Sequence, residues 1–225
     1  MAYQLVIFDW DGTVMDSTGR IIACMHQAGA DLCLPVLEDD AVREIIGLGL
    51  PEALRTLYPG IGDRDLERMR ERYAVHFVAA EASPSRLYPG ARETLATLRA
   101  AGLRLAVATG KSRKGLDRVW ASSGLGDSFD ASRCADETPS KPHPAMVTEL
   151  LTELGVAPER ALVVGDTSFD LQMARDDGVD RVAVSYGAHP VDRLMNFHPL
   201  AVIDALPQLL PLLGVDCETH FEETV

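Results

Sequence analysis

Short, continuously apolar runs alternate along the chain with longer segments of helical periodicity. The apolar runs cover residues 3–8, 103–109, 160–165, 181–185 and 200–204. Continuous rather than alternating runs favour parallel strands, because a strand buried on both faces has few polar positions. Segments between them, such as 90–102 with Leu95 and Leu98 on one helical face, are typical of connecting helices. The pattern therefore predicts an α/β fold with a doubly wound parallel sheet.

One long stretch interrupts this alternation. Residues 15–85 contain no convincing strand pattern, and helices are expected at 21–32, 38–46, 51–57 and 63–80. The segment "ASPSR", residues 82–86, is a natural return linker. The predicted division is an α/β core of residues 1–15 and 86–213, an inserted helical cap of residues 16–85, and a flexible tail of residues 214–225.

Composition narrows the class of protein. The chain has 225 residues, 47% of them apolar, and a formal net charge of -13 from 21 Lys+Arg and 34 Asp+Glu. With no block of Lys or Arg, it would repel a nucleic-acid backbone, so we expect no nucleic-acid partner. No apolar stretch approaches the roughly 20 residues of a membrane helix, and the N-terminus has no basic leader, which predicts a cytoplasmic protein.

The four cysteines give no sign of a disulfide framework or a zinc site. They are Cys24, Cys33, Cys134 and Cys217. They lie far apart, and neither a CxxC pair nor a histidine at zinc-finger spacing accompanies them. Reduced structural thiols are the expected state.

Polar residues follow three of the predicted strands where each one ends. Asp9 and Asp11 follow the first apolar run, Thr109 and Gly110 end the second, and Asp166 follows the run 160–165. Ligands of open parallel sheets bind at this carboxyl edge. Two carboxylates held close together need a cation beside them, and a hard divalent ion such as Mg²⁺ prefers oxygen ligands. Asp9 and Asp166 could supply such a site.

Further groups extend this acidic cluster. Asp170 lies one helical turn beyond Asp166, and Lys141 is presented by the loop "SKPHP", where two prolines forbid a regular helix. A metal, a lysine, a threonine hydroxyl and backbone amides around Gly12 and Gly110 together suit a phosphoryl group, whose oxygens need compensation on all sides.

These residues resemble the motifs of a known family. Asp9-Trp10-Asp11-Gly12-Thr13 is similar to the DxDGT signature of the haloacid dehalogenase (HAD) superfamily. Thr109, Lys141 and the segment "GDTSFD" at 165–170 resemble its second, third and fourth motifs, in the family's order. The resemblance covers the whole chain. It includes a helical cap directly after the first motif, as in the phosphoglycolate phosphatase-like and β-phosphoglucomutase-like branch.

The resemblance implies a Mg²⁺-dependent phosphatase that hydrolyses a small phosphorylated metabolite through an aspartyl-phosphate. Asp9 would be the nucleophile and Asp11 the general acid and base. Thr109 and the Gly110 amide would hold phosphoryl oxygens, and Lys141 would neutralise charge between nucleophile and phosphate.

The resemblance also implies a metal site. A carboxylate oxygen of Asp9, the backbone carbonyl of Asp11 and the side chain of Asp166 would bind Mg²⁺. Asp170 would act through water or orient Lys141. An aspartate at position 11 points to phosphate esters, because relatives that cleave carbon–halogen or carbon–phosphorus bonds lack it.

Several alternatives stay open from the sequence. A phosphosugar mutase of the β-phosphoglucomutase type would use the same residues, and a non-catalytic binding protein on this fold is a rival of another class. Trp10 is expected in the core or at its rim, pointing away from the two aspartates. Lys111 and Arg113 are expected to be solvated charges. Arg43 or Arg55 of the cap could meet a substrate anion or be solvated. The substrate and the oligomeric state are open.

Overall fold

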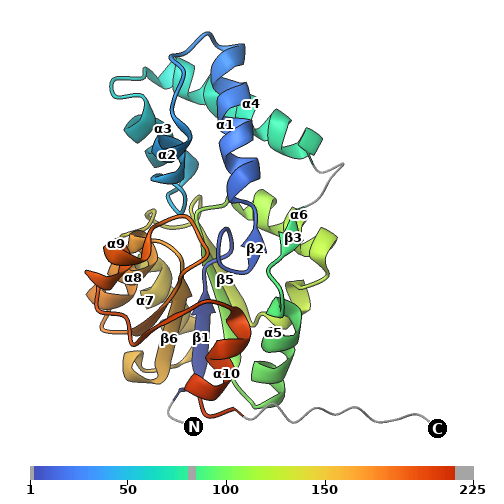
Figure 1. Cartoon of the computed structure of the whole chain (residues 1–225), viewed down its shortest axis with the longest axis vertical. Coiled ribbons are helices and arrows are strands. Elements are labelled where there is room, and N and C mark those ends of the chain that lie inside the picture. The colour runs from blue at the N-terminus through green and yellow to red at the C-terminus, as the bar shows by residue number, and fades with distance from the viewer. Residues whose placement is uncertain (1–2, 81–84, 216–225) are drawn as a thin grey trace, which may run out of the picture.

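The computed structural model describes residues 3–80 and 85–215. Residues 216–225 of the predicted tail, most of the predicted return linker and Cys217 lie outside these residues. Figure 1 shows a lower layer built on a sheet and an upper group of helices, with the two connected near the tip of strand β1 (Leu5–Phe8). The chain is therefore an α/β layer with a helical insertion, the fold class expected from the sequence.

The sheet has six strands in the order β5-β4-β1-β6-β7-β8, and every neighbouring pair is parallel. Their bounds are β1 (Leu5–Phe8), β4 (Arg104–Thr109), β5 (Ala131–Cys134), β6 (Ala161–Gly165), β7 (Asp180–Val184) and β8 (Ala201–Ile203). Five of them match the predicted apolar runs. Strand β5 has the sequence ASRC and lies at the sheet edge, so it shows no apolar run that the sequence pattern could have identified.

Both faces of the sheet are covered by apolar clusters. In β1, Val6 and Phe8 face one cluster, whereas Leu5 and Ile7 face the other. The Phe8 side includes residues of α5 (Ala91–Ala100), α6 (Arg113–Ser123) and α10 (Leu209–Leu212). The other side includes α7 (Ala145–Leu154) and α8 (Ser168–Asp176). This two-sided burial explains why the strands read as continuous apolar runs.

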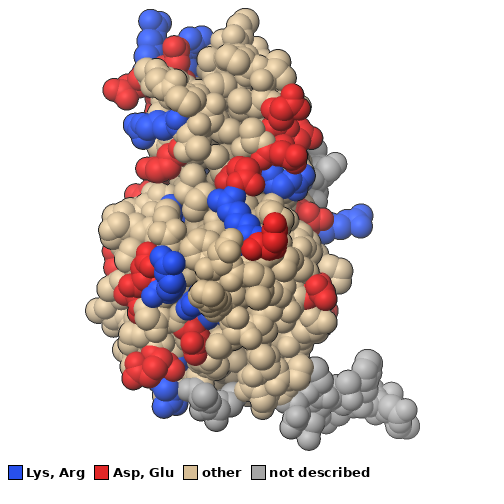
Figure 2. Space-filling model, turned by 60° about the vertical axis from the view of Figure 1, so that its left-hand side comes forward, with Lys and Arg blue, Asp and Glu red and all other residues tan. Residues whose placement is uncertain are grey.

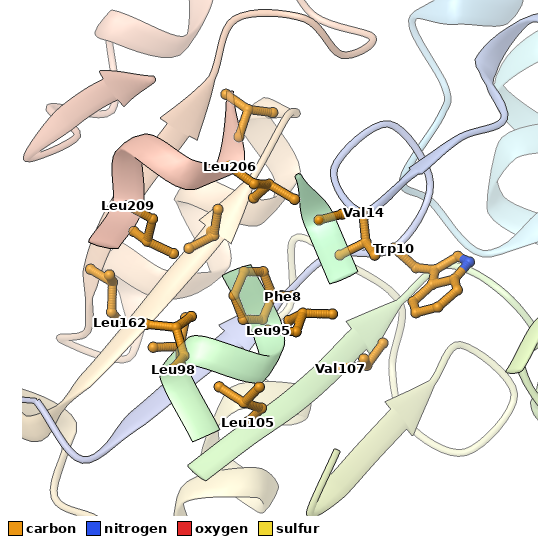
Figure 3. Packing of buried hydrophobic residues seen from close by; sticks show 14 of the residues in the cluster. Phe8, Trp10, Val14, Leu95, Leu98, Leu105, Val107, Leu162, Leu206 and Leu209 are labelled. Atoms are coloured by element: carbon orange, nitrogen blue, oxygen red, sulfur yellow. The ribbon is translucent and has the colours of Figure 1, made fainter. Parts of the chain in front are cut away.

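Trp10 belongs to the core, as expected. Its side chain is fully buried in the cluster that contains Phe8, and its ring makes an edge-on contact with Phe129 at a centroid distance of 6.1 Å. Figure 3 shows Trp10 near Val14 and Val107 in this cluster. The residue between the two aspartates therefore anchors their loop in the core.

The inserted helices form an apolar cluster of their own. They are α1 (Thr18–Asp31), α2 (Asp39–Arg43), α3 (Leu50–Leu57) and α4 (Asp63–Ala79). Their shared cluster includes Met25 of α1, Leu54 of α3 and Met69 of α4, all with almost no exposed surface. We call these four helices and the loops between them the cap. It lies above the carboxyl ends of the strands (Figure 1).

The expectation that residues 15–85 contain no strand is wrong at one end. Strand β2 (Met15–Asp16) pairs antiparallel with β3 (Arg86–Leu87), so the chain leaving the core and the chain returning to it lie side by side. Two-residue strands are too short to show a periodicity. The pairing brings the two connections to the cap together.

On the face shown in Figure 2, Lys and Arg side chains lie among Asp and Glu rather than in one continuous patch. In the described part of the chain, no helix is long and apolar enough to cross a membrane. The short helix α9 (Val191–Met195) follows β7. The three described cysteines, Cys24, Cys33 and Cys134, are free thiols.

Candidate active site

The strand register brings the predicted site residues to one edge of the sheet. Phe8 of β1 is level with Val107 of β4 and Val164 of β6, so Asp9, Thr109 and Asp166 follow at neighbouring positions. All three are buried, with Asp9 2% exposed and the other two fully covered. Polar side chains are rarely buried without partners, so their contacts define what the site can hold.

Lys141 is the central cation of this site. Its Nζ lies 2.6 Å from Asp9 Oδ1 and 2.6 Å from Asp170 Oδ1, and its side chain has no exposed surface. Burial lowers the pKa of Lys141, but the charges and hydrogen bonds of Asp170 and Asp9 outweigh this effect and raise it. The ammonium therefore stays charged.

Asp170 holds this lysine in place. Its Oδ2 accepts hydrogen bonds from the Thr167 amide at 3.0 Å and the Thr167 hydroxyl at 2.6 Å, while Oδ1 accepts from Lys141. The Thr167 amide contact and the Asp170 amide, which donates to Thr167 Oγ1 at 3.4 Å, together form a capping box at the start of α8. Both carboxylate oxygens are engaged, and the geometry fits the prediction that Asp170 orients Lys141.

Asp9 has one oxygen anchored and one without a partner. Oδ1 accepts from Lys141, whereas Oδ2 is buried and has no hydrogen-bond partner in the part of the chain that the structure describes. Burial is the main cause that raises the pKa of Asp9 to about 7; the charges of Asp170 and Asp11 add to it, and Lys141 opposes it. A buried carboxylate oxygen without a partner is costly unless another group compensates it.

The acidic cluster fits a divalent cation. Asp9, Asp166 and Asp170 each offer a carboxylate oxygen within 4.8 Å of the others. Burial, and then the charges of Asp9 and Asp170, raise the pKa of Asp166 well above its usual value. Lys141 alone does not offset these charges. A hard cation held by the Asp9 and Asp166 carboxylates would offset them, since Mg²⁺ prefers carboxylate oxygens.

Gly12 allows the loop after β1 to approach Asp166 closely. Its φ is +90°, and a Cβ at this position would lie 2.2 Å from Asp166 Oδ2. The Gly12 amide donates to the Met15 carbonyl at 2.9 Å, so it is already used inside the turn. The next residue, Thr13, donates its hydroxyl to Asp166 Oδ1 at 3.1 Å. Both residues thus hold the first loop against Asp166, a role that the motif alone did not reveal.

The expectation that Lys111 is a solvated charge is wrong. Its side chain is only 9% exposed, and Nζ lies 2.9 Å from Asp11 Oδ1. The Ser17 hydroxyl donates to the same oxygen at 2.5 Å, so the lysine and the serine both contact Asp11 at Oδ1. The sequence gives no local sign of this pair, because Lys111 follows β4 and Asp11 follows β1. Arg113, in contrast, is partly exposed and pairs with Glu137 away from the site.

The cap covers the site through a glycine-rich loop. A Cβ on Gly110 would lie 2.5 Å from the Leu48 carbonyl and 2.7 Å from the Gly47 carbonyl. The Gly49 amide donates to Ser140 Oγ at 2.7 Å, next to Lys141. Residues 47–49, which we call the cap loop, therefore touch the loops that carry Gly110 and Lys141.

Further contacts fasten the cap to the core. The imidazole of His189 is buried, accepts from the Ser168 amide at Nδ1 and donates from Nε2 to the Glu44 carbonyl at 3.2 Å. Burial, with the nearby Arg193 charge, lowers the pKa of His189, which keeps it neutral. Arg193 also pairs with the Glu44 side chain. Sequence reasoning missed His189, since neither it nor Glu44 belongs to a motif.

The cap arginines considered from the sequence bind within the cap itself. Arg43 lies 3.8 Å from Asp40, and Arg55 lies 4.0 Å from Asp63. Both side chains keep about half of their surface exposed, at 40% and 55%. Their positions favour the solvated alternative over contact with a substrate anion.

Comparison with known proteins agrees with this geometry. Residues 6–184 match the family model of the haloacid dehalogenase-like hydrolases. The chain is 33% identical to the probable phosphatase IndB of Dickeya dadantii, over 92% of this chain and 91% of that protein. It is 32% identical to a phosphoglycolate phosphatase of Nitrosococcus oceani, over 94% and 96%. A crystal structure described as a predicted phosphoglycolate phosphatase from Haemophilus somnus covers 95% of this chain and 99% of its own, with a TM-score of 0.83 and 26% identity.

The chain belongs to the haloacid dehalogenase-like hydrolases. Within that family it lies in the phosphoglycolate phosphatase-like branch, with a helical cap inserted between β1 and β4.

Proposed function

We propose that this protein is a Mg²⁺-dependent phosphatase that hydrolyses a small phosphorylated metabolite through an aspartyl-phosphate. One observation carries the proposal. Asp9 is held by Lys141 at Oδ1 and keeps a buried, unpartnered Oδ2. An anchored carboxylate with one free oxygen is arranged for in-line attack on phosphorus. Membership of a hydrolase family that includes phosphatases supports this chemistry.

The other residues divide the work around Asp9. Lys141 offsets the charge that develops on the phosphoryl oxygens, and Thr109 and the Gly110 amide bind these oxygens at the end of β4. Asp11 donates a proton to the leaving oxygen and then takes one from the water that hydrolyses the aspartyl-phosphate. The Oδ2 of Asp11 is the atom that can do this, because Ser17 and Lys111 occupy Oδ1.

The carboxylates of Asp9 and Asp166 and the backbone carbonyl of Asp11 are the groups that would hold Mg²⁺. When bound, the ion supplies positive charge that offsets both the carboxylates and the phosphate. Asp170 is a poorer ligand, because its Oδ1 already pairs with the Lys141 ammonium. The hydrogen bonds to Asp166 come instead from neutral donors, the Thr13 hydroxyl and the Ala188 amide. Gly12 contributes through its missing side chain rather than through its amide.

The proposal is tested with Asp9→Asn and p-nitrophenyl phosphate in the presence of Mg²⁺. The variant removes the nucleophile with little change in shape, so hydrolysis should fall to background while the circular dichroism spectrum and melting temperature stay close to those of the wild type. Mass spectrometry of acid-quenched protein should detect a phosphorylated Asp9 in the wild type during turnover.

A matched control is Asp127→Asn, because Asp127 is exposed and lies in the connection before β5 rather than after the carboxyl end of a strand. It should keep full activity. Retained activity in Asp9→Asn, or no turnover by the wild type across a panel of phosphate esters, would overturn the proposal.

A further inference from the structure

The loop that follows β7 holds Asp166 through its backbone. We call residues 187–189 the β7 loop. The Ala188 amide donates to Asp166 Oδ2 at 2.7 Å, and the His189 amide donates to the Asp166 carbonyl at 3.3 Å. A Cβ on Gly187 would lie 2.1 Å from Asp166 Cβ, so the loop passes this aspartate too closely for a side chain. The orientation of the proposed metal ligand therefore depends on where this loop lies.

The side chains of the β7 loop face the cap. The Ala188 side chain packs in an apolar cluster with three cap residues, Ile21, Ile46 and Phe77. The His189 ring reaches the residue at the end of α2, with Nε2 3.2 Å from the Glu44 carbonyl. One short segment thus contacts Asp166 through its amides and the cap through its side chains.

The two ring nitrogens of His189 have different partners. The Ser168 amide donates to Nδ1 at 3.0 Å, so Nδ1 carries no proton and Nε2 is the nitrogen that donates to the Glu44 carbonyl. Ser168 is the first residue of α8 and lies two residues after Asp166. The His189 side chain is also buried, with 1% of the residue exposed. This imidazole connects the cap to both segments that position Asp166.

His189 is not arranged to bind the metal itself. Both of its ring nitrogens are engaged, and the acidic cluster that fits an ion among the described residues consists of Asp9, Asp166 and Asp170. Packing alone does not account for it either, because an apolar side chain would fill this space without two polar atoms to satisfy. Carboxylates that bind a metal are oriented by hydrogen bonds from the residues around them. The contacts of His189 place it among these residues.

We propose that His189 is a positioning residue that makes Mg²⁺ binding at Asp166 depend on the contact between the cap and the core. The inference rests on the proposed function, because it takes Asp166 as a ligand of the metal. While Nε2 donates to the Glu44 carbonyl, the β7 loop is held between Asp166 and the cap, and the Ala188 amide keeps the carboxylate in one orientation. Loss of the cap contact frees one side of the loop. The linkage is reciprocal, so a bound ion should also stabilise the contact of the cap with the core.

The test compares two variants of His189 that each keep one of the two ring contacts. The amide group of an asparagine lies near the position of Nδ1, so it can accept from Ser168 but does not reach the Glu44 carbonyl. The amide group of a glutamine lies near the position of Nε2 and can still donate to that carbonyl. The pair therefore separates the cap contact from the contact within the core.

The dissociation constant for Mg²⁺ is measured from the melting temperature as a function of the concentration of the ion. We expect it to rise about tenfold in His189→Asn, the effect of losing a residue that orients a metal ligand. In His189→Gln it should stay closer to the wild-type value. The half-saturating Mg²⁺ concentration for hydrolysis of p-nitrophenyl phosphate should change in the same order.

His198→Asn is the matched control, because His198 is exposed and lies outside the β7 loop. Its φ of +49° is a conformation that asparagine tolerates. The control should leave Mg²⁺ binding unchanged. An unchanged dissociation constant in His189→Asn would overturn the proposal. A rise in His189→Gln as large as in His189→Asn would also overturn it, because the imidazole would then support the loop without using the cap.

A measurement on the wild type tests the proposal even if neither variant folds. Hydrogen exchange with and without Mg²⁺ should show that the ion slows exchange at the Ala188 and His189 amides and also in the cap at residues 44–46, whose amides donate within the end of α2. Slower exchange confined to the β7 loop would contradict the proposal, because the ion would then not act on the cap.

Neither melting nor hydrogen exchange needs turnover, so the inference and the proposed function can fail separately. If His189→Asn binds Mg²⁺ like a wild type that hydrolyses p-nitrophenyl phosphate, the inference about His189 fails and the phosphatase stands. If no ester is hydrolysed but His189→Asn still weakens Mg²⁺ binding, the phosphatase fails and the inference stands. If Mg²⁺ changes neither melting nor exchange of the wild type, the inference fails together with the proposed metal site.

Discussion

At the scale of single residues, the site depends on a buried lysine shared by two carboxylates. Lys141 contacts Asp9 and Asp170 at 2.6 Å each, and all three side chains are nearly or fully inaccessible to solvent. Removing one partner of such a group leaves uncompensated charge in the interior, which costs more than the intact arrangement contributes. The lysine therefore matters for folding as well as for phosphate binding.

We predict that Lys141→Met lowers the free energy of unfolding by about 3–5 kcal/mol. Urea denaturation followed by circular dichroism measures this change, with Lys114→Met as the surface control. Hydrolysis of p-nitrophenyl phosphate should be lost in Lys141→Met under conditions where the variant is still folded. A variant as stable as the wild type would show that Asp9 and Asp170 do not depend on this lysine.

The sequence predicts some residues of the site and not others. The sequence predicts a site at Asp9, Asp11, Thr109, Lys141 and Asp166, because each follows a strand end or lies in a motif. The parallel sheet brings these strand ends together. Lys111, Ser17 and His189 were missed, since their importance depends on contacts between segments that are distant in sequence. The Lys111–Asp11 pair joins two loops whose facing side chains no local pattern describes.

At the scale of secondary-structure elements, the sequence predicts a strand only where the strand buries apolar side chains. The five strands with apolar runs were predicted, whereas the polar edge strand β5 and the two-residue strands β2 and β3 were not. Elements that bury little apolar surface leave little trace in the hydrophobic pattern. The contact between the cap loop and the end of β4 also leaves no hydrophobic pattern in the sequence, because glycine backbone makes it.

This contact gives a prediction for Gly110→Ala. The new Cβ would lie 2.5 Å from the Leu48 carbonyl, so the cap loop or the loop after β4 must shift. Because misplacing reacting groups by about 1 Å can cost 100-fold, we expect kcat/KM to fall by about 10- to 100-fold with little loss of stability. Steady-state kinetics on p-nitrophenyl phosphate and thermal melting measure the two effects.

Gly19→Ala is the control for this substitution. Gly19 lies in α1, and nothing lies within 4 Å of a Cβ at that position. The variant should keep its activity and gain about 0.5–1 kcal/mol of stability, because alanine favours a helix more than glycine does. Wild-type activity in Gly110→Ala would mean that the close contact with the cap loop is not needed.

At the scale of the whole molecule, folding brings like charges together inside an acidic protein. The net charge is -13, yet Asp9, Asp166 and Asp170 lie together in the interior at the carboxyl edge of the sheet. Burial raises the pKa of Asp9 and Asp166, which means that their ionised forms are disfavoured in the protein alone. A bound divalent cation would relieve this repulsion, so the folded state should be stabilised by the metal.

We therefore predict that Mg²⁺ raises the melting temperature of the wild type in a concentration-dependent way. A ligand that binds only the folded state at 100 times its Kd contributes about 2.7 kcal/mol. Asp166→Asn should lose most of the shift, because it removes a charged ligand without changing the side-chain volume, and the exposed Asp127→Asn should keep it. Differential scanning calorimetry with EDTA or Mg²⁺ measures these differences independently of activity. An identical Mg²⁺ shift in Asp166→Asn and the wild type would mean that the ion binds elsewhere, and the buried carboxylates would then need another source of positive charge.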